Sequence, residues 1–220
     1  MLKIAHHVIY NHPLKEGHRF PMEKYDLLPQ QILYEGTCVK ENFFEPEIPN
    51  NKHFFTVHEP DYFFDLLNIT LNQKAARRIG FPLSEVLIER EMVIADGTMK
   101  ASEFALQNGI AMNIAGGTHH AFTNKGEAFC MLNDQAIGAK YLQKKKLANK
   151  VLIVDLDVHQ GNGTAEIFQN DDSVFTFSMH GKSNYPFQKE ISDLDIALPQ
   201  GTTYLKIIAD TKKVNKICIV

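Results

Sequence analysis

The sequence predicts an α/β fold built around a mainly parallel sheet. Strand-like and helix-like segments alternate along the chain, which is the order that joins parallel strands through crossover helices. The clearest strand lies in KVLIVDLDVHQGNG, residues 150–163, where the apolar run Val151–Val154 leads into polar residues and glycines. Such a run is typical of a central parallel strand that is buried on both faces.

Three further segments are predicted in the N-terminal half. Residues 2–10 indicate a short first strand, and residues 23–36, EKYDLLPQQILYEG, a helix that breaks at Pro29 because proline lacks a backbone N–H. Residues 50–68, NNKHFFTVHEPDYFFDLLN, indicate a strand, a turn at Glu59-Pro60 and then a helix.

The C-terminal half continues the alternation. A helix is predicted from the Asp96-Gly97-Thr98 start to Gly109, whose lack of a side chain suits the residue just after a helix. IAMNIAGG, residues 110–117, predicts a strand, and residues 133–146, NDQAIGAKYLQKKK, the next helix. A helix through Thr164 to Phe168 and a strand at 173–180, SVFTFSMH, follow.

Composition indicates one domain over residues 1–220 and excludes several partners. The chain is 44% hydrophobic with a formal net charge of −3, so it lacks the positive field of a direct nucleic-acid partner. No apolar run approaches a membrane span or a signal peptide, which predicts no membrane partner and no export. The three cysteines are far apart and show no zinc-ligand spacing, which favours a reducing, cytoplasmic location.

Two adjacent histidines stand out in AGGTHHAF, residues 115–122. Chance is one explanation, because the chain has 10 histidines and His6-His7 is a second pair, which we interpret as structural. The other explanation is a site in which one imidazole moves a proton and its neighbour supports it. This pair and the polar end of the 150–163 segment both follow predicted strands, and sites in parallel sheets lie beyond the carboxyl ends of strands.

The spacing of DLDVH indicates a metal site. If strand geometry continues, Asp155, Asp157 and His159 share one face at i, i+2 and i+4. A divalent cation relieves the repulsion between the two acids, and zinc is the usual metal for mixed oxygen and nitrogen ligands. Merely solvated acids are the alternative, whereas an Asp-nucleophile phosphatase is poorly supported because His159 stands where threonine is expected.

Three motifs in one order resemble the histone deacetylase family. They are GGTHH at 116–120, FCMLND at 129–134 and DLDVHQGNG at 155–163, and the resemblance extends to about Tyr204. NHPLKEGHRF and FFTVHEPDY are also similar to N-terminal segments of the family. Asn162 resembles the class IV and class IIa pattern rather than the Asp of class I, and the overall pattern is most similar to class IV. The resemblance implies a three-layer arginase/deacetylase-like fold.

The resemblance also implies roles for individual residues. Asp157 and His159 would bind one zinc ion, His120 would be the general base and acid, and His119 its electrostatic support. Asp155 would hold His119, and Asn162 would contact His120. Three residues are implied in substrate binding along an acyl-lysine tunnel: Phe129, Tyr185 and Gly117. A structural potassium ion is implied against residues 155–159 and the Ser178-Met179 segment.

Two further elements of the family pattern are not found in this sequence. They are a later Asp that is the third zinc ligand and a Tyr behind a glycine pair that stabilises the oxyanion. Ile217–Val220 resemble the start of the strand that delivers the Asp, so we expect a fold without its C-terminal strands and helices. Two functions follow. One is a zinc-dependent deacetylase acting on acetyl-lysine proteins or acetylated amines, completed by a C-terminal segment, and the other is a truncated, inactive module.

Overall fold

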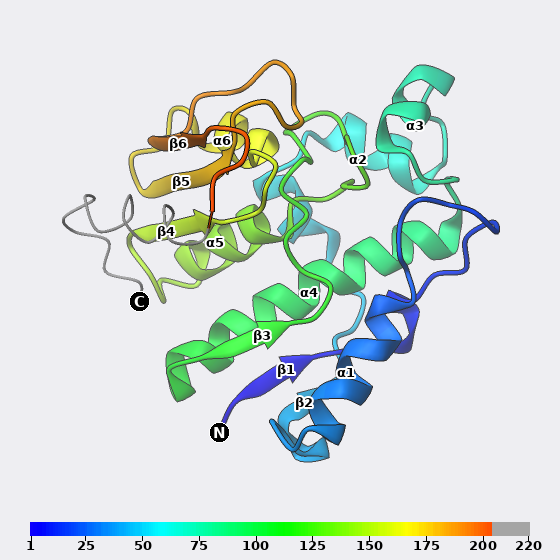
Figure 1. The fold of residues 1–220 in the computed structure, drawn as a ribbon, viewed down its shortest axis with the longest axis vertical. Coiled ribbons are helices and arrows are strands. Elements are labelled where there is room, and N and C mark those ends of the chain that lie inside the picture. Colours follow the sequence, from blue (N-terminus) through cyan, green and yellow to red (C-terminus); the bar gives the residue numbers. More distant parts are fainter. Residues whose placement is uncertain (204–220) are drawn as a thin grey trace.

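The computed structural model describes residues 1–203, which form two three-stranded sheets and the helices that pack on them (Figure 1). The strands are β1 (Lys3–Ala5), β2 (Phe43–Phe44), β3 (Ala111–Asn113), β4 (Val151–Asp155), β5 (Val174–Gly181) and β6 (Leu194–Leu198). The α-helices are α1 (Lys24–Tyr34), α2 (Pro60–Leu67), α3 (Gln73–Ile79), α4 (Glu85–Asn108), α5 (Asp134–Lys144) and α6 (Asn162–Phe168). Short 3-10 helices cover Val8–Tyr10, Lys40–Asn42 and Asn51–Thr56.

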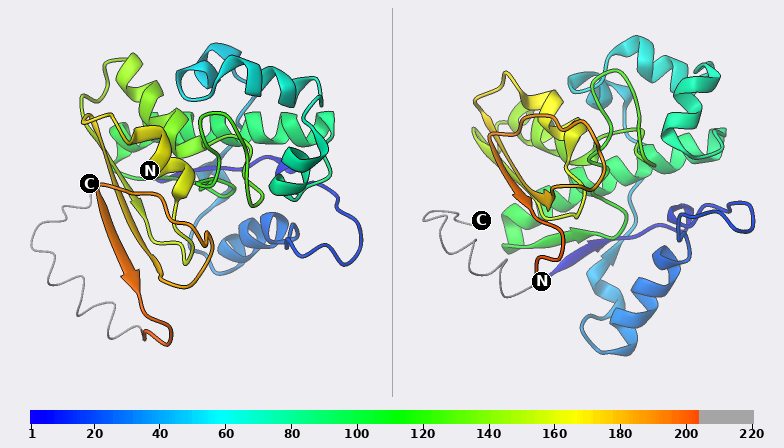
Figure 2. Two further views of the ribbon diagram at one scale, coloured as in Figure 1. Left: turned by 90° about the horizontal axis from the view of Figure 1, so that it is seen from above. Right: turned by 45° about the horizontal axis from the view of Figure 1, so that its top comes forward.

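Both sheets are parallel throughout. Their strand orders are β2-β1-β3 and β4-β5-β6, with Ile4 opposite Met112 in the first and Val154 opposite Phe177 in the second. α4 packs against β1, β3 and α5, and α1 lies on the other side of the first sheet (Figure 2). These layers confirm the predicted α/β class with parallel strands.

The strand β4 differs from its prediction. Within residues 1–203 it pairs only with β5 and therefore lies at the end of its sheet, and the Leu152 side chain is 39% exposed. The prediction of a strand buried on both faces was wrong for the described residues. An apolar run indicates that a strand is hydrophobic, but it does not predict which strands pair with it.

The predicted helix start at residues 96–98 was wrong, because the long helix α4 begins eleven residues or more before it, at Glu85. It begins after Ser84, whose hydroxyl accepts a hydrogen bond from the Leu87 N–H at 3.2 Å. Gly97 lies inside this helix and leaves room for Tyr10, since a Cβ at position 97 would stand 2.6 Å from the Tyr10 hydroxyl. The predicted end is confirmed, since Gly109 has a φ of 84° and its N–H bonds to the Ala105 carbonyl at 2.7 Å.

Three N-terminal predictions were also wrong. The first strand ends at Ala5 rather than continuing to residue 10, and α1 runs through Pro29 without a break. Residues 51–56 form a 3-10 helix instead of a strand, because the Asn50 side chain accepts a hydrogen bond from the Lys52 N–H and starts a helical turn. α2 begins at Pro60, where the predicted turn gives way to a helix.

The main core lies among α2, α4, α5 and the sheets. Phe54 and Phe63 are fully buried and stack with their ring centroids 4.8 Å apart. No helix in the part of the chain that the structure describes is long and apolar enough to cross a membrane.

Candidate active site

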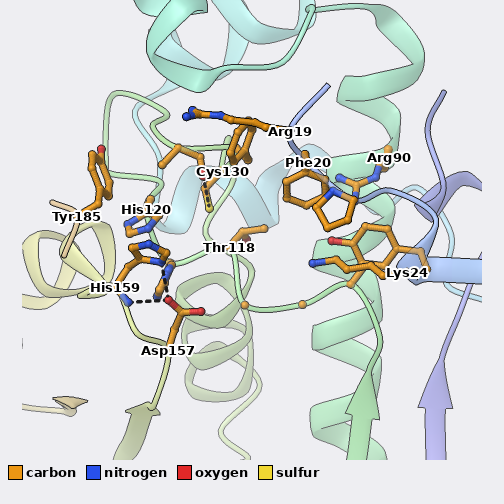
Figure 3. Close-up of a pocket in the computed structure, with 18 of the residues that line it drawn as sticks. Arg19, Phe20, Lys24, Arg90, Thr118, His120, Cys130, Asp157, His159 and Tyr185 are labelled. Carbon is orange, nitrogen blue, oxygen red and sulfur yellow. Dashed lines mark hydrogen bonds and ion pairs between the residues drawn. The ribbon is translucent and has the colours of Figure 1, made fainter. Parts of the chain in front are cut away.

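A pocket of about 670 Å³ opens beyond the carboxyl ends of the strands (Figure 3). Its walls come from the segments that follow β1, β3, β4 and β5, as expected for a parallel sheet. The predicted site residues that line it are Gly117, His119, His120, Phe129, Asp157, His159 and Tyr185. Asp155 and Asn162 stand behind the two histidines as their hydrogen-bond partners.

The adjacent histidines have two different partners. Their rings lie 4.1 Å apart between centroids, and both side chains are buried. His119 Nδ1 is 2.6 Å from Asp155 Oδ2, and His120 Nδ1 is 2.6 Å from Asn162 Oδ1. The structure therefore brings together the two pairs that the sequence placed 36 and 42 residues apart.

The partner of His120 determines the position of its proton. The Asn162 oxygen can only accept, so Nδ1 of His120 carries the hydrogen and Nε2 of the neutral ring keeps its lone pair. Burial, followed by the nearby His119, lowers the pKa of His120 to about 4, and the bond to Asn162 offsets this only in part. The neutral ring suits a group that accepts a proton.

The partner of His119 has the opposite effect. Burial by itself lowers the pKa of His119, but the hydrogen bond and negative charge of Asp155 outweigh it, and the pKa rises above the ordinary value. The structure thus separates the two imidazoles into a readily protonated ring and a ring that stays neutral.

Asp157 and His159 lie together at the pocket wall. β4 ends at Asp155, and the chain then turns, so the three DLDVH side chains do not share one strand face as the spacing predicted. The turn forms because Asp157 Oδ1 accepts from the His159 N–H at 2.8 Å and lies 2.9 Å from its Nδ1. These hydrogen bonds outweigh burial and lower the pKa of Asp157.

The donor set at this wall is of the zinc type. A carboxylate and an imidazole are two of the three protein ligands that a catalytic zinc usually has. Within residues 1–203, no group of three or more His, Cys, Asp or Glu side chains is arranged to hold a metal. The segments predicted to hold potassium lie next to each other, since Asp155 on β4 is opposite Ser178 on β5.

Asp134, which was not predicted as a site residue, binds the backbone of the turn before the histidines. It is 1% exposed, and its Oδ1 accepts from the N–H groups of Gly117 and Thr118 at 3.0 and 2.8 Å. The hydroxyls of Thr118 and Thr98 donate to the same carboxylate. An acid at the first residue of a helix was visible in FCMLND, but its partners lie on two other segments.

His58 is a second supporting residue that the sequence did not reveal. Its Nδ1 lies 2.9 Å from the Phe122 carbonyl, and its Nε2 accepts from the Asn133 N–H at 3.0 Å. The ring is fully buried, which lowers its pKa to about 4 and keeps it neutral. His58 therefore joins the two ends of the loop that carries Phe129.

Phe129 and Tyr185 form the pocket's aromatic walls. The Tyr185 ring stands at 90° to the His120 ring, 5.1 Å between centroids, and its hydroxyl donates to Glu127 at 2.7 Å. Phe129 has a left-handed φ of 70° and follows Ala128 with a φ of 45°. Their N–H groups bond to carbonyls at the end of α3, which holds this uncommon turn in place.

Comparisons with known proteins agree with this geometry. The histone deacetylase domain model matches residues 18–214. An uncharacterized protein of Picosynechococcus sp. is 47% identical over 209 residues, covering 94% of this chain and 70% of its own length. Histone deacetylase 2 of Arabidopsis thaliana is 25% identical over 205 residues, covering 86% of this chain and 51% of its own length.

A solved structure shows the same fold. The crystal structure of a histone deacetylase homolog from Aquifex aeolicus superposes with a TM-score of 0.81 at 23% identity, covering 97% of this chain and 63% of the other. The chain thus spans about half to two thirds of the length of these two named relatives. The fold is the predicted arginase/deacetylase-like one, and the chain belongs to the histone deacetylase family.

Proposed function

We propose that this protein is a zinc-dependent deacetylase that hydrolyses the amide of acetyl-lysine or a related acylated amine. The observation that carries the proposal is the hydrogen bond from His120 to Asn162 at 2.6 Å. It leaves Nε2 as the free base in a pocket that also contains Asp157 and His159. A base beside a zinc-type donor pair is an arrangement that supports hydrolysis of an amide by water.

Each residue then has a defined task. Zinc bound by Asp157 and His159 would polarise the amide carbonyl and acidify a water molecule. His120 takes a proton from the attacking water at Nε2 and returns it to the departing amine. His119, paired with Asp155, carries positive charge more readily and stabilises the negative charge that develops on the substrate oxygen.

The aromatic walls suit the alkyl stem of an acylated amine. Phe129 and Tyr185 offer apolar faces to methylene groups, and they keep water away from the buried histidines. Acetylated proteins and small acetylated amines share this stem, so both belong to the proposed substrate class.

An inactive deacetylase-like module is the second candidate. The observation that favours it is that residues 1–203 supply only a two-residue donor set at the pocket wall. Two ligands bind zinc more weakly than three, and weak zinc binding would leave the histidines without their activated water.

Zinc stoichiometry and turnover of a fluorogenic acetyl-lysine peptide distinguish the candidates. For an active enzyme we expect one zinc per chain, and loss of about 10²- to 10⁴-fold in kcat for His120→Ala, the usual contribution of a general base. His53→Ala, a partly exposed histidine outside the pocket, is the matched control and should leave kcat unchanged. A zinc-free chain without turnover would support the inactive module.

The amide partner of His120 makes a separate prediction. Asn162→Asp places a carboxylate at 2.6 Å from Nδ1, and a negative charge there stabilises the imidazolium. We expect the pKa of His120 to rise from about 4 by more than one unit. Imidazole NMR titration of the metal-free protein measures it, and an unchanged pKa, or an unchanged rate–pH profile in active protein, would contradict the assigned role of Asn162.

A further inference from the structure

We propose that the pocket accepts an acyl group that ends in a carboxylate, as in succinyl-lysine, with Lys24 as the residue that binds this carboxylate. The inference rests on the proposed function, since it names the acyl class for the same site. It starts from the part of the pocket that lies away from His120 and His159. We call this part the second arm; its lining residues are Phe20, Pro21, Lys24, Tyr25, Gly116 and Gly117. In Figure 3, Phe20 and Lys24 lie on the other side of Thr118 from His120 and His159.

Lys24 points its ammonium group into this arm. It is the first residue of α1, and its Nζ lies 4.7 Å from the Phe20 ring centroid and 4.9 Å from that of Tyr25. No carboxylate in residues 1–203 forms an ion pair with it, and no polar atom there accepts its hydrogen bonds. Lys24 is exposed to the pocket, and its ammonium, which lies beside two aromatic rings and has no anion partner within residues 1–203, has hydrogen-bond donors available to a ligand.

The pocket as a whole has more positive than negative charge. Arg19 lies over the Phe129 ring at 4.7 Å and, like Lys24, has no carboxylate partner within the described part of the chain. Arg90 also lines the arm, where it forms an ion pair with the buried Glu91 beside it. Asp157 is the carboxylate of the lining, and we assign it to zinc.

In this proposal one acyl group spans the pocket, with its amide at Asp157 and His159 and its terminal carboxylate at Lys24. With the amide carbonyl beside Asp157 and His159, an acyl chain that continues past Thr118 enters the arm of Lys24 (Figure 3). Burial and the charge of Arg90 lower the pKa of Lys24, whereas the charge of Asp157 raises it. The charges of Arg90 and Asp157 therefore both act on the Lys24 ammonium. The methyl group of an acetyl substrate offers nothing for this ammonium to bind.

The reaction remains an amide hydrolysis. Water adds to the acyl carbon, the C–N bond breaks, and the amine leaves with a proton, so the products are lysine and a dicarboxylate. No oxidant or further reactant is required. The terminal carboxylate takes no part in bond making, and its role is to position the acyl group through a charge-assisted hydrogen bond to Lys24.

Binding of four labelled peptides tests the proposal without requiring turnover. The peptides carry one lysine acylated with succinyl, succinamoyl, butyryl or acetyl, and their Kd values are measured by fluorescence anisotropy on the full chain. The succinamoyl group has the shape of succinyl without its charge. We expect succinyl to bind about tenfold or more tightly than succinamoyl, the range of one charge-assisted hydrogen bond.

Lys24→Met should abolish this preference, whereas Lys52→Met, which removes an exposed cation outside the pocket, should leave it intact. Equal binding of succinyl and succinamoyl, tightest binding of butyryl, or a preference that survives Lys24→Met would overturn the proposal. Circular dichroism checks that both variants fold. If the preference is present but no peptide is hydrolysed, the proposed function fails while the carboxylate site stands; acetyl-lysine turnover without the preference shows the reverse.

Discussion

Gly163→Ala should destabilise the protein by about 3 kcal/mol and remove His120 from its working position. A Cβ at Gly163 would stand 2.6 Å from the Ala121 carbonyl carbon and 2.8 Å from that of His120. Both contacts are with backbone, which cannot rotate away as a side chain can. The start of α6 must therefore shift, and the Thr164 N–H then loses its bond to the His119 carbonyl at 3.2 Å.

Urea denaturation measures the stability, and imidazole NMR reports whether His120 Nδ1 still donates to Asn162. Gly138→Ala is the matched control. Gly138 lies inside α5, and its added Cβ would stand 3.1 Å from a methyl group of Thr98 on α4, so this one side chain must shift by a few tenths of an ångström. Alanine favours a helix by roughly 1 kcal/mol over glycine, which offsets the cost of that shift. Equal stabilities of the two variants would show that α6 does not need its close approach to the histidine loop.

Asp134→Ala should cost about 3 kcal/mol or more, because it removes an acceptor that two N–H groups and two hydroxyl groups share. The N–H groups of Gly117 and Thr118 and the Thr118 hydroxyl, at 2.7 Å, all donate to Asp134 Oδ1. The turn that presents His119 and His120 then loses its bonds to the side chain of α5 and is held by fewer contacts, such as the bond between the Thr164 N–H and the His119 carbonyl. We expect any deacetylase activity to fall together with the stability.

Two further variants separate this role from the general effect of an acid at a helix start. Asp134→Asn keeps an acceptor oxygen for the backbone donors and should cost only about 1 kcal/mol. Asp61→Ala removes an exposed acid from the first turn of α2 and should cost a few tenths of a kcal/mol, the size of a screened dipole interaction. A similar loss for all three variants in thermal denaturation would rule out a special role for Asp134.

Local patterns predicted the elements whose signals lie within a few neighbouring residues. The 151–155 strand and the end of α4 at Gly109 follow from an apolar run and from a glycine after a helix. A turn at Glu59-Pro60 followed by a helix was predicted, and α2 begins at Pro60 itself. The predictions were wrong where contacts between distant segments outweighed a local sequence signal. Asp96-Gly97 resembles a helix start, yet it lies within α4, which begins after Ser84, and the glycine there leaves room for Tyr10.

For the site too, the sequence predicted one aspect and missed another. The identity of its residues was readable from three motifs, because adjacent imidazoles, paired acids and glycines are uncommon together and their chemistry is specific. Their arrangement was not readable. The DLDVH spacing predicted one shared face, but β4 ends at Asp155, and this acid turns to His119 while Asp157 turns to His159.

The sequence alone was sufficient for the α/β class, the order of most elements and the residue types of the site, since these depend on periodicity and on side-chain chemistry. The supporting contacts of Asp134 and His58, the left-handed turn at Phe129 and the position of the Lys24 ammonium in the pocket became visible only in three dimensions. Each depends on segments far apart in the chain, whose approach is set by the packing of helices on the sheets rather than by any local pattern.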